Sequence, residues 1–237
     1  QEELQASLTS VEQDGGELFS NSDLTLDMNN GLLNNQRGNI HTPGQLLLKN
    51  LKDVDNSAGE ISAAKAWSLN AQSLNNDGGK LLSNEKLSLV IDRALSNVKG
   101  VIASANLDSR SDSLNNSSGD IRVRGDVDFS VTGMFDNQNG VVIADNGLTI
   151  TAASLDNRQE GLIGSTKALK LSVDRIDNRS GELSSKADVS LIGAWLDNSD
   201  SGYMLAGGNL ALTVNDVINR NKGLLSGDNG LTLSGKT

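Results

Sequence analysis

The sequence predicts an all-β fold: a right-handed parallel β-helix of about eleven coils of 19–22 residues, with three short strands in each coil. Two observations predict it. A unit of about 20 residues repeats along the whole chain, and the apolar residues inside each unit alternate with polar ones. Such self-similarity is typical of units that stack because one unit alone cannot bury its apolar face. The repeat is marked by ten asparagines at intervals of 19 to 21 residues: Asn35, Asn56, Asn76, Asn97, Asn116, Asn137, Asn157, Asn178, Asn198 and Asn219.

Each asparagine is followed three or four residues later by a glycine, and an aliphatic residue stands two positions after that glycine. Gly181 and Leu183 hold these places in the unit of Asn178. Gln13, with Gly16 and Leu18 after it, forms an eleventh, imperfect copy. We expect the glycine to lie at a corner of the coil and to supply the positive φ that the corner requires.

Three runs of alternating residues in each unit predict three strands. The first run follows the glycine, as in 181–185. The second contains a pair of apolar residues, such as Leu169 and Leu171, and the third places an apolar residue two positions before the asparagine, as Ile176 does. Segments rich in Gly, Asp and Asn, such as 227–230, mark the corners between the runs.

Identical units stacked in one orientation define a parallel β-helix whose coils lie about 4.7–4.9 Å apart. The asparagines alternate with inward aliphatic residues, so we expect their amides to bond to one another from coil to coil as a ladder. A leucine-rich repeat has a similar period, but its asparagine follows the last leucine by three residues. Here the interval is seven to nine, as from Leu48 to Asn56. Residues 1–237 are interpreted as a single β-helical segment, a fragment of a longer protein.

The net charge of −10 disfavours nucleic acid, whose phosphates need a basic surface, and also anionic lipid surfaces. Cysteine is absent, which excludes disulfides and thiolate metal sites. We expect no cofactor and no metal, because a large stacked core is stable without them. An enzyme is not predicted either: the near-constant repeat length leaves no room for long loops around a cleft, and His41 is the only histidine.

The pattern L-D-N-x-x-G-x-[IL]-x-S followed by L-x-L resembles the haemagglutinin-type repeats of filamentous haemagglutinins. Its clearest copies span 155–171 and 176–191. The large exoproteins of bacterial two-partner secretion systems, including contact-dependent growth inhibition effectors, carry similar repeats.

The resemblance implies a secreted or Gram-negative cell-surface protein that leaves the cell through a dedicated outer-membrane transporter. It further implies a rigid filament that presents a receptor-binding tip or a toxin to a target-cell receptor, either protein or glycan. Host-directed adhesins and inter-bacterial toxin carriers share such shafts, so the repeats do not distinguish them.

An alternative function is direct adhesion through a lateral face of this segment. Arg124, Gly125 and Asp126 form an RGD tripeptide at a predicted corner and are the candidate receptor contact. The competing interpretation is an ordinary glycine corner in a chain rich in Asp and Gly.

Two further features left alternatives open. Four aspartates precede consecutive ladder asparagines, and we expect them to form an outward, solvated acidic column beside Arg158 and Arg179, or else a calcium site: Asp136, Asp156, Asp177 and Asp197. The unit at 97–114 has a shorter repeat, and Ser109 replaces a strand aliphatic there. A local bulge or kink is predicted at this unit, either as a tolerated defect or as a binding site.

Overall fold

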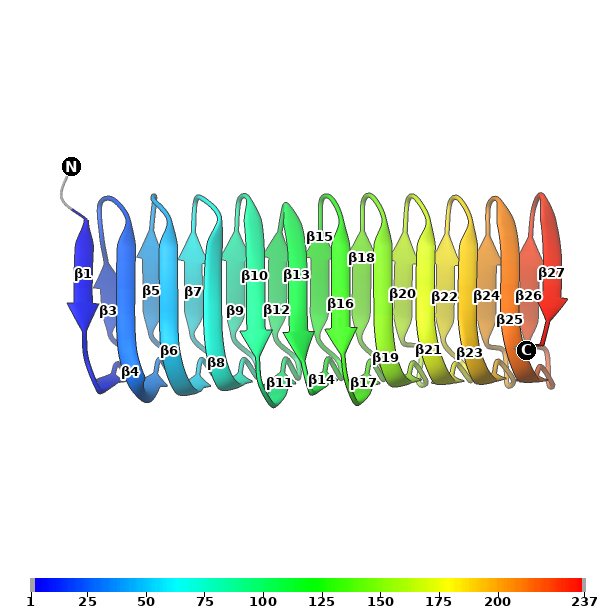
Figure 1. Cartoon of the computed structure of the whole chain (residues 1–237), viewed down its shortest axis with the longest axis horizontal. Coiled ribbons are helices and arrows are strands. Elements are labelled where there is room, and N and C mark those ends of the chain that lie inside the picture. The colour runs from blue at the N-terminus through cyan, green and yellow to red at the C-terminus, as the bar shows by residue number, and fades with distance from the viewer. Residues whose placement is uncertain (1–2, 236–237) are drawn as a thin grey trace.

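The computed structural model describes residues 3–235, which form a straight stack of β-coils and no helix. Figure 1 shows the stack with its coils advancing from left to right. The strands nearer to the viewer run downward and those behind them run upward, so the solenoid is right-handed. This confirms the predicted parallel β-helix. At the usual strand spacing, eleven coils span about 50 Å.

The strands that follow the glycines form one parallel sheet of eleven strands among the described residues. In chain order they are β3 (Glu17–Phe19), β5 (Asn39–Thr42), β7 (Glu60–Ala63), β9 (Lys80–Ser83), β12 (Val101–Ser104), β15 (Asp120–Val123), β18 (Val141–Ala144), β20 (Leu162–Ser165), β22 (Glu182–Ser185), β24 (Tyr203–Ala206) and β26 (Leu224–Gly227).

The opposite sheet holds sixteen of the described strands, all in parallel pairs. Its main path is β1 (Leu4–Ser7), β4 (Leu24–Asn34), β6 (Leu46–Asp55), β8 (Trp67–Asn75), β10 (Lys86–Ile91), β13 (Asn106–Ser111), β16 (Val127–Val131), β19 (Leu148–Asp156), β21 (Leu169–Asp177), β23 (Val189–Asp197), β25 (Asn209–Ile218) and β27 (Gly230–Ser234). The short strands β2 (Ser10–Glu12), β11 (Ala94–Ser96), β14 (Ser113–Asn115) and β17 (Met134–Asp136) continue this sheet beyond its bend.

The second and third predicted strands of a coil are separate in only part of the stack. In the coils of β10/β11, β13/β14 and β16/β17 the chain turns between them, as predicted. In most other coils they form one strand of 9–11 residues, such as β4 or β21, that bends without ending. The strand does not end because its parallel pairing with the next coil continues through the bend, where Ala152 pairs with Val173 and Ser154 with Arg175.

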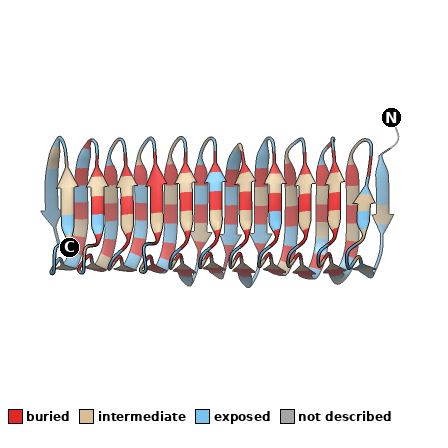
Figure 2. Ribbon diagram, turned by 180° about the vertical axis from the view of Figure 1, so that it is seen from behind, coloured by how far each residue is buried: buried red, intermediate tan, exposed pale blue. Residues whose placement is uncertain are grey.

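The core is a set of apolar columns that run along the axis. Inward residues pair with their equivalents in the next coil, as Leu148 does with Leu169 and Leu169 with Val189. These three are at most 1% exposed, and buried residues alternate with more accessible ones along the strands (Figure 2). Burying one such side chain stabilises the fold by about 1.5–3 kcal/mol before entropy is subtracted. The buried residues form one continuous cluster.

The bulge or kink predicted for the 97–114 coil is wrong. Strand β13 pairs residue for residue with β10 and β16, without a register shift. The coil is short because two corners are short: Ser104 to Leu107 and Ser111 to Leu114 each take three steps, where the paired segments of the next coil take four. A deletion at a corner leaves the strand ladder intact. Among the described pairs, register shifts occur instead in β4 at 27–33 and in β6 at 48–51.

The prediction that the repeat glycines have positive φ is also wrong. Positive φ falls on the residue before the glycine, for example Lys99 (φ 55°) or Ser118 (φ 56°), and most of these residues are not glycine. The repeat glycine is required for space. A Cβ at Gly140 would overlap the backbone oxygen of Asn116, the ladder asparagine of the preceding coil. Glycine at this position therefore lets one coil lie directly on the next.

We therefore predict that Gly140→Ala destabilises the protein by about 1–3 kcal/mol, because the stacked backbone must move to accept a methyl group. Gly164→Ala is the matched control. Its Cβ would lie close to Ile143 Cδ1, at 3.2 Å, which is the end of a flexible side chain, and at ordinary contact distance from Ser184. Urea unfolding of both variants measures the difference, and equal losses of stability would contradict the steric explanation.

Candidate functional site

The ladder asparagines form one hydrogen-bonded column along the solenoid. Each side-chain Nδ2 donates to Oδ1 of the equivalent asparagine in the following coil at 2.7–3.0 Å, from Asn35 through to Asn219. Gln13 extends the column by donating to Asn35 Oδ1 at 2.8 Å. The ladder residues Asn35 to Asn198 are 0% exposed, whereas Asn219 is exposed.

Every buried amide in this column also donates to one or two backbone carbonyls. Asn137 Nδ2, for example, reaches Gly140 O at 3.2 Å in its own coil and Leu162 O at 3.4 Å in the next. All the ladder bonds point toward the C-terminus, so successive amide dipoles add and strengthen one another. The column thus ties each coil to its neighbours at a position that is closed to solvent.

The residue before most of the ladder asparagines holds the same turn. Its side-chain oxygen accepts the backbone N–H two residues later, as Asp136 does from Gln138 at 3.0 Å. Eight coils share this contact, through Asn34, Asp55, Asn75, Asn115, Asp136, Asp156, Asp177 and Asp197. Where Ser96 takes this place, Asp77 of the preceding coil accepts the N–H of Val98 instead. The pairing of Asp or Asn with the ladder asparagine is therefore a turn signal.

The aspartates of the predicted acidic column are half-buried or buried and not fully solvated, and the two arginines offset the charge of three of them, as expected. Arg158 contacts Asp156 at 2.7 Å and Asp177 at 3.6 Å, and Arg179 contacts Asp177 at 2.6 Å and Asp197 at 3.8 Å. Asp156 is only 8% exposed. Burial raises the pKa of Asp177, but the hydrogen bonds and charge of Arg179, with the charge of Arg158, outweigh burial and leave that pKa below its ordinary value.

The alternative calcium site lacks ligands: within residues 3–235 no three acidic or histidine side chains are grouped so that they could hold a metal ion. The arginines occupy the positions between the carboxylates.

The RGD tripeptide lies at the corner between β15 and β16, where Arg124 and Asp126 are exposed. Arg124 Nη2 donates to Asn84 O at 2.6 Å. Asp126 Oδ1 accepts the N–H of Gly147 at 3.0 Å, one coil further on. The side chain of Asn106, one coil earlier, accepts the N–H of Asp126 in the same way.

Gly125 is explained by the same stacking. A Cβ there would overlap Asn106 Oδ1, and Gly44 and Gly208 have the same relation to Asp23 and Asp188 of the preceding coils. All three members of the tripeptide thus have a structural reason to be present.

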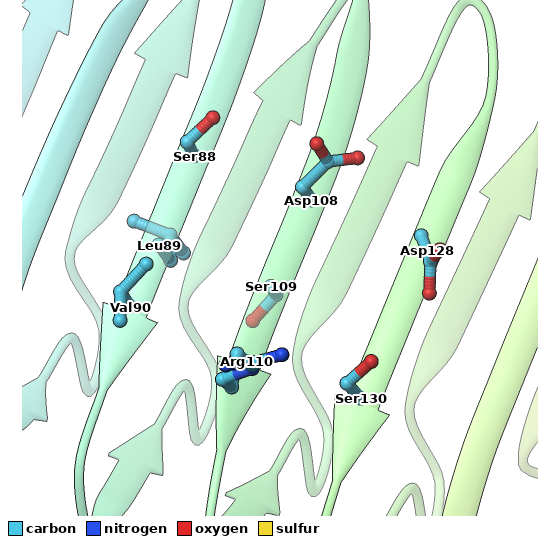
Figure 3. Close-up of a pocket in the computed structure, with 8 residues that line it drawn as sticks. All are labelled: Ser88, Leu89, Val90, Asp108, Ser109, Arg110, Asp128 and Ser130. Atoms are coloured by element: carbon cyan, nitrogen blue, oxygen red, sulfur yellow. The ribbon is translucent and has the colours of Figure 1, made fainter.

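The surface of the long-strand sheet carries shallow hollows. One of about 340 Å³ lies across β10, β13 and β16, where Ser88, Asp108, Arg110, Asp128 and Ser130 line it (Figure 3). A second of about 470 Å³ shares Ser130 and continues along the axis to Ile192. Together they form a lateral trough that crosses the strands at right angles. Its lining mixes small polar and aliphatic side chains, with more acidic than basic groups.

A model of the haemagglutinin repeat matches the chain four times, at residues 2–76, 50–131, 117–193 and 165–235. Together these matches cover nearly the whole sequence. The chain belongs to the haemagglutinin repeat family. Searches of the curated proteins and of the solved structures found no match.

The haemagglutinin repeat motif can now be assigned physical roles. In L-D-N-x-x-G, the leucine fills the core, the aspartate closes the turn, the asparagine forms the ladder, and the glycine allows close stacking. Sequence reasoning found the leucine and asparagine roles from their alternation. It missed the turn role of the aspartate, although the short polar side chain two residues before a tight corner is a signal for it. The described residues also include no helix of the length and hydropathy that a membrane span requires.

The ion pairs of Arg158 and Arg179 predict an acid-dependent loss of stability. Since the pKa of Asp177 is lowered in the folded state, its contribution is present above the unfolded pKa and is lost as the pH falls through the folded pKa. We expect the melting temperature of the native protein to fall more between about pH 6 and about pH 3 than that of an Arg158→Gln/Arg179→Gln variant. Parallel pH profiles of the two proteins would contradict this assignment.

Proposed function

We propose that this chain is a rigid section of an extracellular filament of a two-partner secretion exoprotein. The observation that carries the proposal is the asparagine ladder, which ties each coil to the next from Asn35 through to Asn219. Haemagglutinin repeat proteins are generally secreted or cell-surface adhesins, which supports a location outside the cell. A stack held together at every coil resists bending and keeps its two ends apart.

In this proposal the shaft presents a receptor-binding tip or a toxin at the surface of a Gram-negative cell. Export occurs through an outer-membrane two-partner secretion transporter, which recognises parts of the parent protein other than these repeats. The target-cell receptor, protein or glycan, contacts the tip. The net charge of −10 favours solubility of a long filament and disfavours nucleic acid as a partner.

We propose no catalytic role for this segment. The family and the fold are typically non-enzymatic, and the trough is shallow. His41 lies outside the trough, stacked on Phe19 with ring centroids 4.6 Å apart. An acid–base mechanism needs groups that converge on one reacting atom, and the carboxylates of the trough lie on its open surface.

Direct adhesion by a lateral face is the second candidate function. The lateral trough and the exposed RGD corner support it. The strands cross the trough, so a ligand in it would find no open strand edge and would contact side chains alone. Its acidic excess favours a neutral or basic partner over polyanions.

Binding of the labelled chain to bacterial and epithelial cells distinguishes the two functions. The shaft proposal predicts no saturable binding to either cell type. Saturable binding would contradict it and place a receptor site on this segment.

Asp126→Asn is the matched variant for the RGD corner. Asparagine already fills the equivalent place at Asn106 and accepts the same backbone N–H, so this substitution removes the carboxylate and keeps the corner. If binding occurs and this variant loses it, the RGD corner is the contact. If the variant binds as before, the contact lies elsewhere on the lateral face.

A further inference from the structure

The core of the 97–114 coil is interrupted by two serines. Ser109 stands in the column between Leu89 and Phe129, and Ser111 stands between Ile91 and Val131. The serines are only 4% and 2% exposed, so both point into the interior. Neither hydroxyl has a hydrogen-bond partner among the described residues.

A third hydroxyl in the same coil is unpaired as well. Other coils also have a serine at the corner position of Ser104, and there the hydroxyl bonds to a backbone carbonyl: Ser83 Oγ donates to Lys65 O at 3.0 Å, and Ser165 Oγ to Lys167 O at 2.6 Å. Ser104 Oγ is 3% exposed and has no such partner. The corner after Ser104 is one residue shorter than that of the next coil.

The defect lies in the core and not in the backbone. Pairing through β13 is unshifted, and Asn97 and Asn116 keep their ladder bond at 2.7 Å. The neighbouring coil partly compensates with aromatic volume: Phe129 and Phe135 meet edge to face with centroids 5.2 Å apart. The 97–114 coil still buries only three apolar side chains, against five in the preceding coil and six in the following one, and it holds three desolvated hydroxyls without partners among the described residues. Both differences weaken its two interfaces.

We propose that the 97–114 coil is a built-in opening point of the solenoid. In a stacked repeat protein, the free energy of unfolding is approximately the sum of the stability of each unit and the stability of each interface between units. The stack therefore opens first at the unit whose own stability and interfaces contribute least. The coils before and after this point act as two blocks that unfold independently. Within the interior of the described stack, this is the coil that yields first under tension or heat.

Hydrogen exchange of the intact chain under native conditions tests the proposal directly. We expect the amides of β13 and β14 to exchange at least about tenfold faster than those of the equivalent strand β19, because opening here costs less free energy. Equal protection of β13 and β19 would overturn the proposal, and this outcome does not depend on any variant.

A second experiment replaces the buried serines by aliphatic residues. Ser109→Leu/Ser111→Val should slow the exchange of the β13 and β14 amides by at least about tenfold. Ser109→Leu/Phe129→Leu should slow it too, and this variant removes the aromatic side chain that could otherwise leave no room for the new leucine. Ser172→Val, an exposed substitution on β21, is the control for added apolar surface and should leave the exchange of β13 unchanged.

If β13 exchanges fast in the native chain, and both core variants fold but exchange as fast as the native chain, the serines are not the cause and the proposal fails. Trypsin gives an independent readout. Arg110 is exposed at the centre of the coil, and native cleavage there should precede cleavage at Arg122 and Arg124. Cleavage at those arginines first would also contradict an opening at this coil.

Discussion

The asparagine ladder constrains the rest of this structure. A buried amide must find hydrogen-bond partners, and in this interior the partners are the equivalent amide of the next coil and the carbonyls beside it. Asn116 can therefore meet Asn137 only if the two coils keep the same register and spacing. The turn formed by the residue before most of the asparagines, and the glycine after each of them, both serve this close approach. Each coil is consequently fixed by its neighbours, and the rod extends without a change of geometry.

The strands and the corners tolerate change very differently. Strand positions keep their pairing even in the short 97–114 coil, because a one-residue slip would turn the core side chains outward. Corners absorb the length differences, and their backbone can adopt positive φ with ordinary residues such as Lys99 or Ser118. The repeats of this chain therefore differ at their corners while the pairing of their strands remains constant. In a filament, the inward columns of side chains would then provide the stability, and the lateral faces and corners would provide any recognition of a partner.

The sequence predicted the features that depend on periodicity. The 19–22-residue repeat gives the coil, the alternation of residues such as Leu169 and Leu171 gives the inward columns, and the recurrence of asparagine gives its place in the repeat. It could not predict features that depend on what lies one coil away. Gly140 is needed because of Asn116, Gly125 because of Asn106, and the ion pairs of Arg158 because Asp177 lies on the next coil. Such contacts depend on three-dimensional stacking, which a linear pattern specifies only after the register is known.

The ladder is also the feature that a solution experiment can observe most directly. The measurement is hydrogen exchange of asparagine side-chain amides by nuclear magnetic resonance. The structure predicts that the buried ladder amides, Asn35 to Asn198, exchange slowly and together, while the exposed side chain of Asn70 exchanges at once. Rapid exchange of the ladder amides at the rate of Asn70 would mean that the column is open to water, and it would contradict the account of how these coils are held together.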